Sequence, residues 1–137
     1  GAEHHGWIWI YGTFVRKYVP EQAMVFIPPQ SDIWPQEGNQ FYFRWFVYPR
    51  DLTQSTDPLA KIPDEAEYML ISRGGWQGGA AGWPKTAISP ICIEEVHLIN
   101  RTTLQEFAAT KANLDQVVKS DTWGIVKLTP GKKETCL

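Results

Sequence analysis

The sequence predicts an α+β domain of mostly antiparallel strands, in which about six strands form a curved sheet or a partly closed barrel or sandwich and one helix packs on it. Three observations favour this class. Segments rich in β-branched and aromatic residues recur along the chain, bounded by proline and glycine. A single clear helical spacing of apolar residues occurs, in the C-terminal half. The composition, with seven Trp, six Phe, five Tyr, ten Pro and eleven Gly, is typical of strands joined by long turns.

The predicted helix covers residues 103–119, approximately. Thr103 and Glu106 have the spacing of a capping box, in which the two side chains satisfy free backbone amides at a helix start. Lys119 falls in the last turn, where a cation suits the negative end of the helix dipole. The apolar stripe that would face the sheet consists of Leu104, Phe107, Ala108, Leu114, Val117 and Val118.

Three strands are expected in the N-terminal half. Residues 7–18 are predicted to form a long strand that ends before Pro20, and residues 23–27 to return beside it as a hairpin partner. Residues 41–48 are predicted to form the strand with the densest apolar side chains.

Three more strands are expected in the rest of the chain, at residues 65–72, 91–99 and 123–128. Residues 50–64 and 73–87 are polar or glycine-rich and are expected to be surface loops. Strands 7–15, 41–48 and 91–99 are largely apolar on both faces, whereas a strand solvated on one side alternates apolar and polar residues. One helix covers only one side of a sheet, so a second sheet, barrel closure, another subunit or a ligand is expected to cover the other.

Length and charge limit the class of protein. The 137 residues are expected to form a single β-rich domain, residues 1–137, with flexible tails at about 1–6 and 130–137. The net charge of −2 and the lack of a basic stretch disfavour nucleic-acid binding. No apolar run reaches the ~20 residues that span a bilayer. The sequence does not indicate a compartment.

Cys92 and Cys136 match no metal-binding spacing and do not require a disulfide. No metal-ligand spacing or cofactor fingerprint occurs, so we expect neither a metal nor a cofactor. Asn100-Arg101-Thr102 is a glycosylation sequon, which has meaning only in a secreted protein.

Glu95 and His97 are candidates for acid–base chemistry. In strand 91–99 they lie two positions apart and therefore on one face, together with three isoleucines. A carboxylate this close can raise the pKa of a histidine and orient its ring, as in a general acid–base pair inside a cavity. The same pattern also fits an exposed strand end or a core pair whose hydrogen bonds are satisfied.

Trp76 and Trp83 are candidates for ligand binding, because they lie in the glycine-rich loop 73–87. Such a loop can be a stacking platform for sugars and rings, or a plug at the end of a barrel. Tyr42, Arg44 and Tyr68 are further binding candidates, since they could position a ligand or substrate, and Arg44 could stack on an aromatic ring.

These patterns favour a non-catalytic recognition or assembly protein that uses its aromatic strand faces and the Gly/Trp loop. The expected partner is another protein or a second copy of the chain, and a small molecule or carbohydrate is the other option. The alternative is a small cavity enzyme of lyase, isomerase or cyclase type, with Glu95 and His97 as its acid–base pair.

Overall fold

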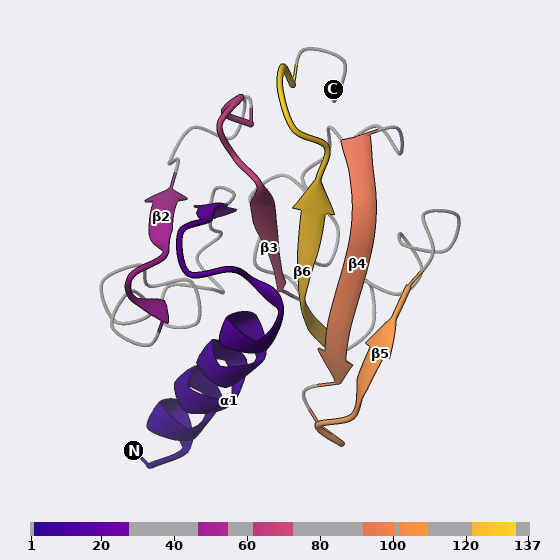
Figure 1. The fold of residues 1–137 in the computed structure, drawn as a ribbon. Coiled ribbons are helices and arrows are strands. Elements are labelled where there is room, and N and C mark those ends of the chain that lie inside the picture. The colour runs from indigo at the N-terminus through magenta and orange to yellow at the C-terminus, as the bar shows by residue number, and fades with distance from the viewer. Residues whose placement is uncertain are drawn as a thin grey trace.

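A six-stranded mixed sheet is the centre of the fold (Figure 1). The computed structural model describes residues 2–27, 47–54, 62–72, 92–100, 102–109 and 122–133. Within these residues lie one helix and six strands: α1 (Ala2–Tyr18), β1 (Met24–Ile27), β2 (Asp51–Gln54), β3 (Tyr68–Ser72), β4 (Ile93–Asn100), β5 (Glu106–Ala108) and β6 (Thr122–Leu128).

The sheet has the strand order β2-β1-β3-β6-β4-β5 and is open, with β2 and β5 as its two ends. Strand β1 runs parallel to both β2 and β3. The pairs β3–β6, β4–β6 and β4–β5 are antiparallel. The predicted α+β class and strand number are therefore confirmed, whereas the antiparallel prediction holds for only one side of the sheet and the sheet is not a barrel.

Helix α1 occupies the segment for which the sequence predicts a long strand, so that prediction is wrong. Tyr11, Phe14, Val15 and Tyr18 have the i, i+3, i+4, i+7 spacing of a helix, and the first three are buried. The segment is apolar on nearly all sides, so its sequence also fits the two-residue period of a strand. Tertiary packing decides between helix and strand. Strand β1 consequently has no hairpin partner in residues 7–18 and pairs with β2 and β3 instead.

Both faces of the central strands are buried within the chain itself. One face packs against α1, and the cluster there includes Tyr11, Phe14, Val15, Val25, Leu52, Tyr68, Leu70, Ile99, Trp123 and Ile125. The other face packs with the 62–66 segment, and its cluster includes Phe26, Ile62, Ala66, Met69, Cys92, Ile93, Val96, Leu98, Val126 and Leu128. These strands need no partner subunit to cover them, so a surface for a partner has to lie elsewhere.

The turn between β4 and β5 replaces the predicted start of the helix at residue 103. The Asn100 side-chain oxygen accepts hydrogen bonds from the amides of Thr102 and Thr103, both at 2.8 Å. Leu104 then adopts a left-handed conformation with φ of 61°, which a helix does not tolerate. Strand β5 follows and pairs with β4, and Phe107, expected on the buried stripe, is 38% exposed. Residues 110–119 of the predicted helix lie outside the described residues.

The buried Arg50 joins the end of α1 to the start of β2. Its guanidinium donates from Nε to the carbonyl of Val19 at 2.7 Å, from Nη2 to that of Arg16 at 3.2 Å and from Nη1 to that of Val47 at 3.3 Å. The Arg16 carbonyl lies in the last turn of α1 and the Val19 carbonyl directly follows the helix, where a cation is favourable. Arg50 therefore connects the end of α1 to the start of β2 through buried hydrogen bonds.

The remaining strand predictions have mixed outcomes. Strands predicted at 65–72, 91–99 and 123–128 are confirmed as β3, β4 and β6 with small shifts of their ends. Of the strand predicted at 41–48, residues 41–46 lie outside the described residues and Val47 and Tyr48 are not in a strand. In the part of the chain that is described, no helix has the length and apolarity needed to cross a membrane.

Candidate functional site

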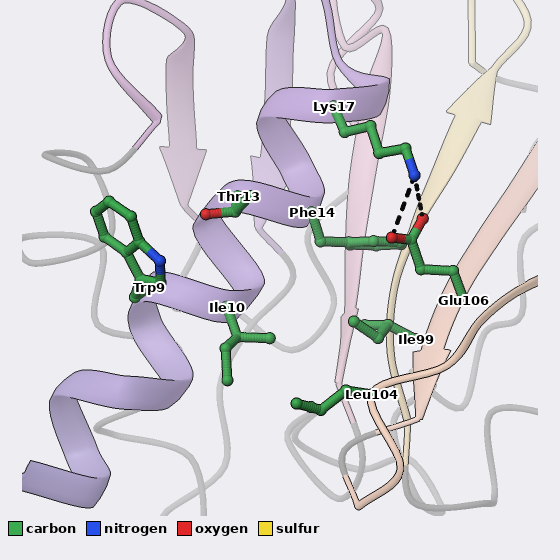
Figure 2. Close-up of a pocket in the computed structure, with 8 residues that line it drawn as sticks. All are labelled: Trp9, Ile10, Thr13, Phe14, Lys17, Ile99, Leu104 and Glu106. Atoms are coloured by element: carbon green, nitrogen blue, oxygen red, sulfur yellow. Dashed lines mark hydrogen bonds and ion pairs between the residues drawn. The ribbon is translucent and has the colours of Figure 1, made fainter.

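A pocket of about 230 Å³ lies between α1 and the turn that joins β4 to β5 (Figure 2). The helix contributes Trp9, Ile10, Thr13, Phe14 and Lys17, and the sheet side contributes Ile99, Leu104 and Glu106. Figure 2 shows Ile10 pointing toward Leu104, with Lys17 and Glu106 at one end of the pocket and Trp9 at the other. The pocket opens to solvent between the exposed side chains of Trp9 and Leu104.

The pocket exists because of the local structure on both sides. The face of α1 that carries Tyr11 and Val15 packs on the sheet, and this places Trp9 and Thr13 toward solvent. The left-handed backbone at Leu104 turns its side chain out of the hairpin, where it is 45% exposed. Trp9 is 61% exposed. Two large apolar side chains thus stand at the surface beside apolar walls.

The polar end of the pocket is an ion pair with an added hydroxyl. Lys17 Nζ lies 3.0 Å from Glu106 Oε1 and 3.3 Å from Oε2. The Tyr18 hydroxyl donates a short hydrogen bond to Glu106 Oε1. These contacts link the last turn of α1 to the edge strand β5.

The Tyr18 ring extends the polar end toward β4. It stacks on the His97 ring with centroids 4.2 Å apart and an angle of 15° between the planes. His97 Nε2 in turn lies 3.4 Å from Glu95 Oε2. Five side chains from three elements are therefore connected: Glu95, His97, Tyr18, Glu106 and Lys17.

The pKa shifts at this end move three groups away from neutral pH. The hydrogen bond from Tyr18, followed by that from Lys17, holds the pKa of Glu106 below its usual value despite partial burial. The hydrogen bond to Glu106 raises the pKa of Lys17 and also that of Tyr18. At pH 7 the carboxylate is thus charged, the ammonium is charged and the phenol is neutral, so none of the three exchanges protons readily.

The predicted acid–base pair is brought together, but outside the pocket. Glu95 and His97 are same-face neighbours on β4 as expected, and both are partly exposed. Neither lines the pocket, and they reach its polar end through Tyr18. This arrangement resembles the exposed strand end that the sequence also allows.

Tyr68 is not in the pocket. It is buried in the cluster beneath α1, and this burial raises the pKa of its phenol. Trp76, Trp83, Tyr42 and Arg44, the other predicted binding residues, lie outside the described residues. Among the residues that are described, no three His, Cys, Asp or Glu side chains are grouped so as to hold a metal ion.

Sequence patterns do not identify the residues that line the pocket. They place Trp9 and Lys17 in a strand, and Leu104 and Glu106 in a helix. A helical wheel drawn over residues 7–18 puts Trp9 on the side opposite Tyr11 and would mark it as exposed. No sequence signal relates Lys17 to Glu106, because 89 positions separate them.

Comparison of the chain with protein-family models, curated proteins and solved structures finds no match to any of them.

Proposed function

We propose that this chain is a non-catalytic recognition or assembly protein, and that the pocket beside α1 receives an apolar side chain of a protein partner. The observation that carries the proposal is the pair of exposed apolar side chains, Trp9 and Leu104, at a half-open apolar pocket. Tryptophan is among the residues that contribute most to binding energy at protein interfaces.

The size of the pocket favours a side chain over a complete small molecule. Its volume of about 230 Å³ is below the roughly 300–1,000 Å³ of most ligand pockets. A large apolar side chain inserted between Ile10 and Leu104 would bury both, while the partner backbone would lie across Trp9. Interface anchors commonly fill pockets in this way.

The polar end favours binding over proton transfer. Lys17, Tyr18 and Glu106 satisfy one another and keep fixed protonation states near neutral pH. Fixed charges at the rim of an apolar pocket orient a partner and exclude mismatched ones. A general acid or base needs a pKa near the working pH instead.

Selection of peptides that bind this chain from a random library tests the proposal without knowledge of the natural partner. We expect enriched peptides to share one large apolar residue and to lose binding to Trp9→Ala and Leu104→Ala. Tyr48→Ala is the matched control, because Tyr48 is 75% exposed and does not line the pocket. Peptides that bind the Trp9→Ala protein as tightly as the wild type would contradict the proposal.

A second copy of the chain is one form that the partner could take. Sedimentation velocity over a range of concentrations distinguishes it, since self-association through the pocket would weaken in Trp9→Ala and remain in Tyr48→Ala. Monomers at all concentrations would exclude a second copy of the chain as the partner.

A small cavity enzyme of lyase, isomerase or cyclase type is the second candidate, and the contact of Glu95 with His97 favours it. The variant His97→Gln keeps a hydrogen-bonding side chain but removes the imidazole that would act as the acid or base. If the chain is such an enzyme, a metabolite mixture incubated with wild type would contain more of one product and less of its precursor than the same mixture incubated with this variant. Identical profiles would remove this candidate.

A further inference from the structure

The β4–β5 turn carries the sequon Asn100-Arg101-Thr102, which the proposed function does not use. It is the one Asn-X-Ser/Thr pattern in the sequence, since Asn39 and Asn113 are not followed by Ser or Thr at the second position. Such a pattern is common by chance, so it needs support from the structure and from the compartment.

The structure describes how the side chain of Asn100 is held. Asn100 is the last residue of β4 and half-buried, and residues 102–108 beyond it are exposed. Its Oδ1 accepts both turn hydrogen bonds, from the amides of Thr102 and Thr103 at 2.8 Å. Within the described part of the chain, Nδ2 makes no hydrogen bond. A group attached to Nδ2 leaves both contacts of Oδ1 in place.

The compartment is indicated by a second, independent observation. Cys92, at the other end of the same strand region, is buried and forms a disulfide bond. Disulfides persist in secreted and other extracytoplasmic proteins and are rare where thiols are kept reduced. An oxidising compartment is also where asparagine is glycosylated. The disulfide thus indicates a compartment in which the sequon can be glycosylated.

We propose that Asn100 is an N-glycosylation site and that the chain is modified in an extracytoplasmic compartment. The donor is an oligosaccharide activated as a glycosyl diphosphate. A transferring enzyme deprotonates Nδ2, which forms a bond to the anomeric carbon while the bond from that carbon to the diphosphate oxygen breaks. The diphosphate leaves with the electron pair, and Nδ2 keeps one hydrogen.

The backbone shows when transfer has to occur. The amide of Asn100 donates to Gln105 O at 3.0 Å, and its carbonyl accepts from the amide of Leu104 at 2.8 Å. The folded turn is therefore closed around Asn100, and transfer precedes folding of the β4–β5 hairpin. In the folded protein the glycan would stand beside Leu104, at the margin of the pocket.

Mass spectrometry of the full chain from its natural source tests the site directly. We expect the peptide that contains Asn100 to carry hexose and N-acetylhexosamine, and a glycan-releasing amidase to convert Asn100 to aspartate. We also expect no free thiol in the denatured protein before reduction. An unmodified Asn100 in every molecule would overturn the proposal, and so would a free Cys92 thiol.

Variants expressed through a secretory pathway separate the sequon from other sites. Asn100→Gln and Thr102→Ala should each lose the amidase-sensitive mass, whereas Thr102→Ser should retain it and Asn113→Gln should not change it. Thr102→Ala keeps the Asn100 turn contacts intact, so it remains informative if Asn100→Gln fails to fold. A glycan that persists in Thr102→Ala would place the modification at another residue and overturn the assignment.

Discussion

Arg50 shows how one buried cation can fix the meeting point of a helix and a sheet. Its three hydrogen bonds to the carbonyls of Val19, Val47 and Arg16 use the planar fork of the guanidinium, which an ammonium cannot reproduce. Among the residues that the structure describes, no carboxylate hydrogen-bonds to it; the three carbonyls and the helix dipole stabilise its charge, and the nearby carboxylate of Glu21 adds an electrostatic attraction.

The variant Arg50→Lys should destabilise the fold by about 1–3 kcal/mol, because the shorter reach of the ammonium leaves buried carbonyls unsatisfied. Denaturation in urea measures this change, with Arg16→Lys as the control, since the Arg16 side chain is exposed. A loss equal to that of the control would mean that the three hydrogen bonds contribute nothing to stability.

Gly124 in β6 is required by the close packing of neighbours on the same side of the sheet. A Cβ at this position would overlap Leu98 Cδ2 and lie 2.9 Å from the backbone oxygen of His97, which cannot move aside easily. The Gly124 carbonyl also accepts the hydrogen bond of the buried Tyr11 hydroxyl at 2.8 Å.

We therefore expect Gly124→Ala to cost roughly 1–3 kcal/mol through overpacking. The melting temperature would fall, and the Tyr11–Trp123 stack, now 5.3 Å between centroids, would be disturbed. Near-ultraviolet circular dichroism detects the second effect. An unchanged melting temperature would show that β4 and β6 can separate to admit a methyl group.

At the scale of elements, the contact between α1 and β5 is a long-range connection made by polar groups. Lys17 and Tyr18 at the end of the helix hold Glu106 on the edge strand. The pKa of Glu106 is lower in the folded protein than in the unfolded chain, where it is near 4.5. The ionised Glu106 therefore stabilises the fold at pH values above 4.5. This contribution to the free energy of unfolding is lost as the pH falls through the folded pKa.

The variant Glu106→Gln should thus be less stable than wild type at pH 6–7, by no more than about 1 kcal/mol since the pair is partly exposed. The difference should shrink toward zero as the solution is acidified below the folded pKa. Urea denaturation at several pH values measures both curves. A constant difference at every pH would assign the effect to packing and not to ionisation.

The elements also show what sequence patterns can and cannot predict. Strands β3, β4 and β6 are predictable because short β-rich segments between proline, glycine and polar residues fit few alternatives. Residues 7–18 are predicted as a strand because their apolar side chains fit the two-residue period of a strand as well as the 3.6-residue period of a helix. Thr103 and Glu106 fit a capping box, but the Asn100 turn and the left-handed Leu104 use the same residues to form a hairpin.

For the whole molecule, the apolar strands are explained by burial inside the chain and not by a missing subunit. The sequence predicts that a second layer is needed, and α1 supplies one layer from a segment whose pattern also fits a strand. The pocket could not be predicted, because it depends on long-range placement of Trp9 and Lys17 beside Leu104 and Glu106. Same-face placement of Glu95 and His97 is predictable, since it follows from strand geometry alone.

The central claim is that the pocket beside α1 binds an apolar side chain of a partner. Isothermal titration of a selected peptide into wild type, Trp9→Ala and Tyr48→Ala tests it most directly, with the melting temperature of each protein measured in parallel. We predict at least about tenfold weaker binding for Trp9→Ala, equivalent to about 1.4 kcal/mol, with Tyr48→Ala and all melting temperatures close to wild type. Equal affinity of wild type and Trp9→Ala would contradict the claim.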